Sequence, residues 1–208
     1  MGARRLQHAS VAGEDPVISR HLPTQHTRRL RLEPLMEAHA GALFPGLSDD
    51  TLYEFIGERP PESVEALAGR YRQLETRMSP DGRAIWLNWV LWSILGGSYV
   101  GVVQATVLPD KAYIASVLFR AAWGMGYARE ASAATIEHLR DEWGVNDFRA
   151  TVDVRNHRSI ALLTRLGFQR IAVRRSAGMI RSAPSEEYVY RLRLDPPSSP
   201  GERPEKER

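Results

Sequence analysis

From Ala84 to Pro109 the chain carries no charged side chain, and this stretch constrains the fold more than any other part of the sequence. It is long enough to cross a bilayer as one apolar helix. However, Gly96, Gly97 and Ser98 divide it into AIWLNWVLWSIL and YVGVVQATVL, two halves of strand length that are rich in Val, Ile, Trp and Tyr. Apolar runs joined by a Gly-Gly turn are typical of a β-hairpin. We therefore expect two buried strands and no membrane partner.

The composition limits the chemistry that the chain can carry. With 208 residues, of which 43% are hydrophobic, it is expected to form one globular domain with tails. The absence of cysteine excludes disulfides, thiolate metal sites and a thiol nucleophile, and we expect a reducing, cytoplasmic location. Its 28 basic residues include only two lysines, Lys111 and Lys206, and are mixed with 25 acidic ones. We attribute this arginine bias to a G+C-rich coding sequence and expect neither a nucleic-acid partner nor a metal.

The two ends differ from the middle of the chain. Residues 1–26 show no clear period, and from Asp195 the segment DPPSSPGERPEKER is rich in proline and charge and has nothing to bury. We expect a mobile N-terminal extension at 1–26, a folded domain at 27–194 and a disordered tail at 195–208.

Within the domain, hydrophobic periodicity and turn residues predict the order of the elements. Strands are expected at 29–35, in the two halves of the hairpin, and at 111–119, 148–154, 168–173 and 187–194; helices are expected at 36–47, 62–78, 127–143 and 156–166. Helical crossovers flank the strand at 148, whereas hairpins dominate elsewhere. This predicts an α+β fold with a mixed central sheet of about seven strands and about four helices.

A glycine-containing turn joins the strand at 111–119 to the following helix. The segment Arg120 to Ala128 places Gly124 and Gly126 where free backbone N–H groups and the helix dipole converge, which favours an anion. Glycine lets the backbone approach a pyrophosphate closely and can adopt positive φ. A plain tight turn into a helix explains the same residues. A Rossmann fingerprint would need a third glycine where Arg129 stands, and the G-K-[ST] of a P-loop is absent, so both are excluded.

A second segment, beginning at Asn156, follows the strand at 148–154. It reads as a helix with an asparagine cap and a glycine stop, and each residue has a structural explanation on its own. Three segments occur in this order along the chain: TRRLRLEPL, the W-G-x-G-Y-A-x-E-A motif (Trp123, Gly124, Gly126, Tyr127, Ala128, Glu130, Ala131) and the N-x-x-S-x-x-L-L-x-x-L-G-F motif (Asn156, Ser159, Leu162, Leu163, Leu166, Gly167, Phe168). Together they resemble the GNAT superfamily of N-acetyltransferases, and within it the branch of ribosomal-protein N-terminal acetyltransferases. The resemblance covers about Thr27 to Leu194.

The resemblance implies a GNAT fold with splayed central strands and acetyl-CoA as co-substrate. The backbone N–H groups of the turn would hold the pyrophosphate, and the strand before it would pair with the pantetheine arm. Asn156 would hydrogen-bond the pantetheine, and Ser159 would protonate the departing thiolate. A backbone N–H near Leu118 would polarise the thioester carbonyl. The cofactor-binding residues implied in this way are Val117, Leu118, Phe119, Trp123, Gly124, Met125, Gly126, Tyr127, Ala128 and Asn156, with Arg129 as a further contact to a phosphate or, alternatively, a solvent-facing residue. Arg158 and Arg165 are weaker candidates for the ribose phosphate.

The general base is not identified by the sequence. Relatives often carry a Glu on the strand at 111–119, which here has no carboxylate between Ala112 and Phe119. Asp49, Asp50 and Glu54 are candidates, and water is an alternative. Five aromatic residues lie near the segments that line the acceptor groove in the family: Tyr53, Phe55, Trp86, Trp89 and Trp92. Strand alternation places Trp89 on the opposite face from Trp86 and Trp92, so at least one belongs to the core. The others would favour an apolar or aromatic amine if they line the groove.

Three functions are compatible with these features. The first is direct transfer of acetyl from acetyl-CoA to a small-molecule amine, without an acyl-enzyme. The second is acetylation of a protein N-terminus, as the ribosomal-protein branch implies by analogy. The third is a non-catalytic acyl-CoA-binding domain. A homodimer is a further expectation in all three cases.

Overall fold

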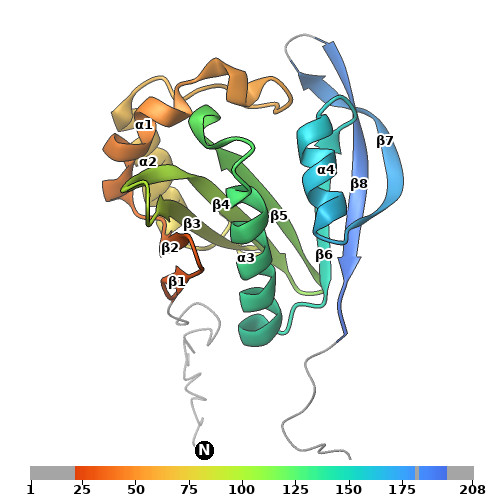
Figure 1. Cartoon of the computed structure of the whole chain (residues 1–208). Coiled ribbons are helices and arrows are strands. Elements are labelled where there is room, and N and C mark those ends of the chain that lie inside the picture. Colours follow the sequence, from red (N-terminus) through yellow and green to blue (C-terminus); the bar gives the residue numbers. More distant parts are fainter. Residues whose placement is uncertain (1–21, 181–182, 196–208) are drawn as a thin grey trace, which may run out of the picture.

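The computed structural model describes residues 22–180 and 183–195, which form one open sheet with helices on both faces (Figure 1). Among these residues the sheet has eight strands in the order β1-β2-β3-β4-β5-β6-β8-β7, and only β5 and β6 pair in parallel. The strands are β1 (Gln25–His26), β2 (Leu30–Pro34), β3 (Ile85–Ser93), β4 (Ser98–Leu108), β5 (Lys111–Leu118), β6 (Asp147–Asp153), β7 (Gln169–Ile180) and β8 (Ala183–Arg193). The helices are α1 (Ala40–Leu47), α2 (Val64–Glu75), α3 (Tyr127–Trp143) and α4 (His157–Arg165). The predicted α+β class, mixed sheet and four helices are confirmed.

The hairpin predicted from the uncharged stretch is present as β3 and β4. The chain turns between Ser93 and Ser98, where Gly97 adopts φ 58°. Trp89 is fully buried on the face of β3 that meets α3, whereas Trp86 and Trp92 point to the other face and are partly exposed. Within the described residues, no helix is long and apolar enough to cross a bilayer.

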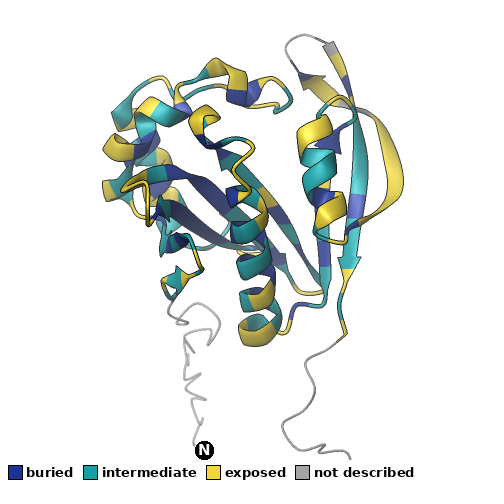
Figure 2. Cartoon of the chain, viewed as in Figure 1, coloured by how far each residue is buried: buried dark blue, intermediate teal, exposed yellow. Residues whose placement is uncertain are grey.

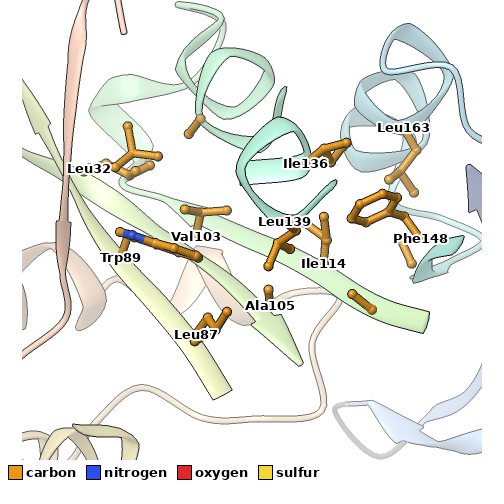
Figure 3. Packing of buried hydrophobic residues seen from close by; sticks show 14 of the residues in the cluster. Leu32, Leu87, Trp89, Val103, Ala105, Ile114, Ile136, Leu139, Phe148 and Leu163 are labelled. Atoms are coloured by element: carbon orange, nitrogen blue, oxygen red, sulfur yellow. The ribbon is translucent and has the colours of Figure 1, made fainter. Parts of the chain in front are cut away.

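Two hydrophobic clusters hold the layers together. The larger lies between the sheet and helices α3 and α4; Figure 3 shows Trp89, Val103 and Leu139 meeting there. The smaller one lies between the opposite face and helices α1 and α2, around Val90 and Val102. Figure 2 shows buried positions concentrated on the inner sides of strands and helices. Strand β3 therefore contributes side chains to both clusters, because its successive residues point to opposite faces of the sheet.

Differences from the sequence prediction lie at the ends of the domain. Leu22 is buried, the Trp89 indole donates to the carbonyl of Pro23 at 3.3 Å, and β1 pairs with β2. The domain thus begins before Thr27, and the prediction of a mobile extension is wrong for residues 22–26. The remainder of that prediction, residues 1–21, and most of the predicted tail, 196–208, lie outside the described residues. Strand β1 also accounts for the eighth strand where about seven were expected.

The last two strands are longer than the sequence predicted. Residues 169–175 of β7 are exposed on both faces, and the charged Arg174 and Arg175 do not continue an apolar alternation beyond Val173.

Helix α1 begins at Ala40, after a 3-10 turn at Glu37–His39, and α2 ends at Glu75, so both are shorter than the predicted 36–47 and 62–78. The end of α3 and the start of α4, in contrast, agree with the prediction. Gly144 caps α3 with φ 67°, and Asn156 caps α4 by accepting a hydrogen bond from the N–H of Ser159 at 3.1 Å.

The sheet opens at its centre, between β5 and β6. Their pairing is limited to Ala112 with Phe148 and Tyr113 with Arg149, after which the strands diverge. The predicted splaying of the central strands is confirmed, and it leaves the second half of β5 paired with β4 alone.

Candidate active site

The second half of β5 presents unpaired backbone groups to this opening. Phe119 donates its N–H to the carbonyl of Val100 at 2.9 Å, which continues the ladder between β4 and β5. Because bonded and non-bonded positions alternate in an antiparallel ladder, the N–H groups of Ser116 and Leu118 turn away from β4 and toward the gap. The carbonyl of Leu118 accepts a hydrogen bond from the Trp123 indole at 2.8 Å. The N–H of Leu118 is therefore the free donor at the end of β5.

Strand β4 is fitted tightly against this part of β5. A β-bulge at Val100 shifts the register, and the following Gly101 adopts φ 151°. A Cβ at Gly101 would lie 2.2 Å from the carbonyl oxygen of Val117 and 2.8 Å from the Cα of Leu118. Only glycine allows the two strands to approach in this way.

The glycine turn leaves backbone donors free at the N-terminus of α3 and is a candidate anion site. Gly124 and Gly126 adopt φ 78° and 81°, so the positive φ suggested by the sequence is present at both. In the part of the chain that the structure describes, the N–H groups from Gly124 to Arg129 have no acceptor, and no side chain caps the helix. Six converging donors at the positive end of a helix dipole fit a phosphate or pyrophosphate.

Residues from the start of the domain hold this turn in place, and sequence reasoning missed this contribution. The carboxylate of Glu130, in the first turn of α3, accepts from the Thr27 hydroxyl at 2.6 Å, from the Arg29 N–H at 2.8 Å and from Arg29 Nε at 2.6 Å. Arg29 Nη1 also donates to the Met125 carbonyl at 2.8 Å, and the guanidinium lies 4.9 Å from the centre of the Tyr127 ring. Burial raises the pKa of Glu130, but the hydrogen bonds from Thr27 and Arg29 lower it more, so the pKa lies below its ordinary value.

A cleft of about 720 Å³ runs from the turn along β5 to the start of α4. Most of the predicted site residues line it: Val117, Leu118, Trp123, Gly124, Gly126, Tyr127, Ala128, Arg129, Asn156 and Ser159. Two do not. The ring of Phe119 packs against Gly46 in the opposite layer, and Met125 is half exposed and reaches Arg29 through its carbonyl. The backbone N–H and carbonyl of Phe119 are both bonded within the protein, to Val100 and Ala122, whereas Met125 keeps an N–H in the turn that is free within the described part of the chain.

Three arginines line the same cleft and supply positive charge near the anion site. They are Arg129 on α3 and Arg158 and Arg165 on α4. The guanidinium of Arg158 lies 4.1 Å from the centre of the Trp123 ring, which places a cation–π contact between α4 and the turn. Guanidinium groups bind phosphate well, so the cleft suits a ligand with several phosphates.

The first turn of α4 presents two uncharged polar groups to the cleft. The side-chain oxygen of Asn156 is used in capping the helix, which leaves its NH2 group for a ligand. The hydroxyl of Ser159 has no hydrogen-bond partner among the described residues and is half-buried. It is thus available as a proton donor.

A second cavity of about 420 Å³ meets the cleft at this point. It lies between α2, the strands β4 and β5, and the ends of β6 and β8, and it passes through the opening in the sheet. The residues shared by both cavities are Phe55, Ile56, Ser116, Val117, Asn156, Ser159 and Leu162. Both predicted catalytic residues, Asn156 and Ser159, lie at the junction.

The carboxylates near the junction differ in their suitability as a base. Of the sequence candidates, Glu54 lines the cleft, whereas Asp49 and Asp50 line neither cavity and Asp49 caps a turn through Thr51. Asp153 lines the second cavity but is fully buried. Hydrogen bonds from Arg155 and Ser185 lower its pKa to about 2, although burial alone would raise it. Such a carboxylate is a weak base.

The aromatic residues expected at the acceptor groove separate into two groups. Tyr53 and Phe55 line the second cavity, but Trp86, Trp89 and Trp92 line neither cavity. Trp92 instead stacks edge-on against Tyr99, and its ring lies 5.4 Å from the guanidinium of Arg31 on β2. The three tryptophans therefore give no support to an aromatic acceptor.

The described residues contain no group of three or more His, Asp or Glu side chains arranged to hold a metal ion.

Comparison with known proteins gives a consistent result. The family model described as acetyltransferase (GNAT) domain matches residues 29–169. No curated protein matches. Among solved structures, a T. thermophilus protein assigned as an acetyltransferase is 26% identical, with a TM-score of 0.68 over 83% of this chain and 90% of that one. RimL, a ribosomal α-N-protein acetyltransferase in complex with coenzyme A, has a TM-score of 0.73 at 18% identity, covering 83% and 98%. The microcin self-immunity acetyltransferase MccE, in complex with acetyl-CoA and AMP, has a TM-score of 0.70 at 18% identity, covering 81% and 94%.

Proposed function

Because the chain belongs to the GNAT family of acetyltransferases, we propose that it transfers the acetyl group of acetyl-CoA to the primary amine of a small molecule by direct attack. The observation that carries this proposal is the junction of the two cavities. The cleft with the phosphate-type site and the second cavity meet at Asn156 and Ser159. A thioester that extends from the cleft and an amine in the second cavity would meet there.

Different residues would bind the different parts of acetyl-CoA. The free N–H groups from Gly124 to Arg129 would hold the pyrophosphate, and the three arginines of the cleft would contact the remaining phosphate. The unpaired groups of Ser116 and Leu118 would pair with the pantetheine arm, as a further strand would. The NH2 group of Asn156 would bind the same arm.

The reaction itself needs little further machinery. The amine nitrogen attacks the thioester carbon, the C–N bond forms and the C–S bond breaks. The Leu118 N–H stabilises the oxyanion, and Ser159 donates its proton to the leaving sulfur while its oxygen takes one up from water, so no alkoxide remains. The amine gives up its proton to water or to a carboxylate near the junction, for which Glu54 is placed in the cleft. Because the chain contains no cysteine, an acyl-cysteine intermediate is excluded.

Release of free thiol from acetyl-CoA over a panel of amines and short peptides tests the proposal. Turnover with amines and none with peptides supports it. Turnover with peptides alone supports acetylation of protein N-termini, which the fold likeness to RimL keeps as the second candidate. Tight binding of CoA without turnover on either set would support the third function, a non-catalytic domain, and refute the proposal.

A further inference from the structure

The second cavity continues past the junction into a deep end between α2 and the sheet. Its walls there are mainly aliphatic side chains from α1, α2 and the strands: Leu35, Leu47, Leu67, Leu74 and Val102. Two tyrosines, Tyr53 and Tyr71, also line it. On the proposed function, this end receives the part of the acceptor that does not react.

Tyr71 carries a hydroxyl that the protein does not satisfy. Its side chain belongs to α2 and is 3% exposed, and among the described residues its oxygen has no hydrogen-bond partner. Burial raises the pKa of Tyr71 well above its ordinary value, so the hydroxyl keeps its proton and remains a donor. Buried polar groups without a partner are rare in native proteins and indicate that a partner comes from elsewhere.

Tyr53 provides an internal comparison in the same cavity. It is also buried, at 8% exposure, but its hydroxyl donates to the carbonyl of Leu47 at 2.9 Å. One tyrosine hydroxyl is therefore used by the fold, and the other is buried without a partner among the described residues.

A second uncharged polar group lies in the same cavity. Gln104, in the middle of β4, is partly exposed and lines the cavity, and its side-chain amide has no partner among the described residues. Its neighbour across the β3–β4 ladder is Asn88, whose buried NH2 group is also unpaired. The amide of Gln104 and the hydroxyl of Tyr71 are thus two polar groups, unpaired within the described chain, on residues that line the same, mainly aliphatic cavity.

The charged side chains of the cavity are, in contrast, mostly neutralised by ion pairs. Arg70 pairs with Glu58 at 2.7 Å, Asp153 pairs with Arg155 at 2.8 Å, and Glu187 pairs with Arg174 at 3.4 Å. Arg59 also lines the cavity and has no ion pair among the described residues, so the cavity offers a cation but no unpaired carboxylate. A second ammonium on the acceptor would therefore enter the deep end without a counter-charge, which is strongly unfavourable. An uncharged oxygen would instead satisfy the hydroxyl of Tyr71.

We infer that the acceptor is an amine whose far end is apolar and uncharged and carries a hydroxyl or carbonyl oxygen, bound by Tyr71 and Gln104. This deepens the proposed function and depends on it for the identity of the cavity as the acceptor site. It excludes polyamines as the preferred class. The preference for the acceptor then depends on Tyr71 and Gln104 and not on the tryptophans, which do not line the cavity.

Three matched arylethylamines test the inference: phenethylamine, tyramine and the phenethylamine that carries a para-aminomethyl group. Their affinities for the CoA-loaded protein are measured by calorimetry, which does not require turnover. We expect tyramine to bind about tenfold more tightly than phenethylamine, since it alone gives the buried hydroxyl a partner. The doubly charged amine should bind most weakly.

The variant Tyr71→Phe should remove the preference for tyramine and leave the affinity for phenethylamine unchanged. Tyr53→Phe is the matched control: it loses a hydroxyl from the same cavity but should retain the preference. If Tyr71→Phe does not fold, Gln104→Leu takes its place, with the same expected loss. Equal affinity for the two amines in the unmodified protein, or a preference that survives in Tyr71→Phe, would overturn the inference.

Thiol release with the same amines separates this inference from the proposed function. Turnover without any preference between phenethylamine and tyramine would refute the inference and leave the function standing. A Tyr71-dependent binding preference without turnover would support the binding site and refute the enzymatic role.

Discussion

The contact between Glu130 and the first residues of the domain yields a sharp prediction about the anion site. Glu130→Gln keeps the shape of the side chain but removes its charge. The amide oxygen can still accept from Thr27 and from the N–H of Arg29, which share one carboxylate oxygen. The new NH2 group then faces Arg29 Nε, so the charge-assisted bond at 2.6 Å is replaced by two opposed donors.

The expected loss of stability follows from this geometry. The side chains of Arg29 and Glu130 are 29% and 18% exposed, so solvent screens the ion pair only in part. Removing one charge-assisted hydrogen bond of this kind, together with a favourable charge in the first turn of a helix, costs about 2 kcal/mol in the free energy of unfolding. For a protein of this size the melting temperature should fall by about 4–8 °C. Looser support of the turn should also weaken CoA binding and raise its KM, with a smaller effect on kcat.

The contribution of Glu130 to the free energy of unfolding should depend on pH, in a direction that follows from its pKa. The pKa of Glu130 lies below its ordinary value of 4.5 in the folded protein. The ionised form is therefore stabilised by folding, and its contribution is complete above pH 4.5 and is lost as the pH falls through the folded-state pKa. The stability difference between the unmodified protein and Glu130→Gln should accordingly stay constant above pH 4.5 and shrink as the pH falls below it.

Denaturant unfolding at several pH values and calorimetry with CoA measure both effects. Glu137→Gln is the matched control, because Glu137 lies on the same helix, is exposed, and forms no hydrogen bond or ion pair within the described part of the chain. It should leave stability and CoA affinity unchanged. A stability difference for Glu130→Gln that stays constant as the pH falls below 4.5, or an unchanged affinity for CoA, would refute the reasoning.

Three further substitutions separate the parts of the site. Gly101→Ala places a Cβ against the Val117 carbonyl and should destabilise the fold by at least about 2 kcal/mol, measured by thermal unfolding; a full-stability variant would contradict the close approach of the strands. Ser159→Ala should lower kcat by up to about 100-fold while calorimetry finds unchanged CoA affinity; an unchanged kcat would remove Ser159 as the proton donor. Gly124→Asp should abolish CoA binding, because it sets a carboxylate against a phosphate and strains a position with φ 78°; retained binding would remove the phosphate assignment.

The sequence predicted the elements well where the hydrophobic pattern and turn residues agree. The hairpin around Gly97, the capped start of α4 at Asn156 and the end of α3 at Gly144 each follow from local chemistry. Strand β1 has only two residues and is held by its pairing with β2, which no local pattern encodes. The length of β7 was missed because the predicted strand ended at Val173, and Arg174 and Arg175, which follow, are exposed and charged and so do not continue an apolar alternation.

The site was predictable to the extent that backbone conformation depends on glycine. Gly124 and Gly126 indicate an anion site because few other residues adopt their conformation. The support from Arg29 and the contact between Arg158 and Trp123 each join segments that are far apart in the sequence. Nothing in the local pattern of these residues indicates the partner. The unpaired hydroxyl of Tyr71 likewise follows from the packing of α2 in the folded chain and not from a local pattern.

On the proposed mechanism, the arrangement around Leu118 determines which part of the site must supply most of the rate. Its carbonyl is bound by the Trp123 indole and its N–H faces the opening, so β5 offers the developing oxyanion one donor. One such donor is worth about 3 kcal/mol and proton transfer from Ser159 about as much at most, because a thiolate is already a good leaving group. Holding the thioester and the amine in line supplies about 7–11 kcal/mol in favourable cases. Positioning of the two substrates by the whole site therefore contributes more to the rate than any single group that touches the reacting atoms, and the ordered turn takes part in it by holding CoA.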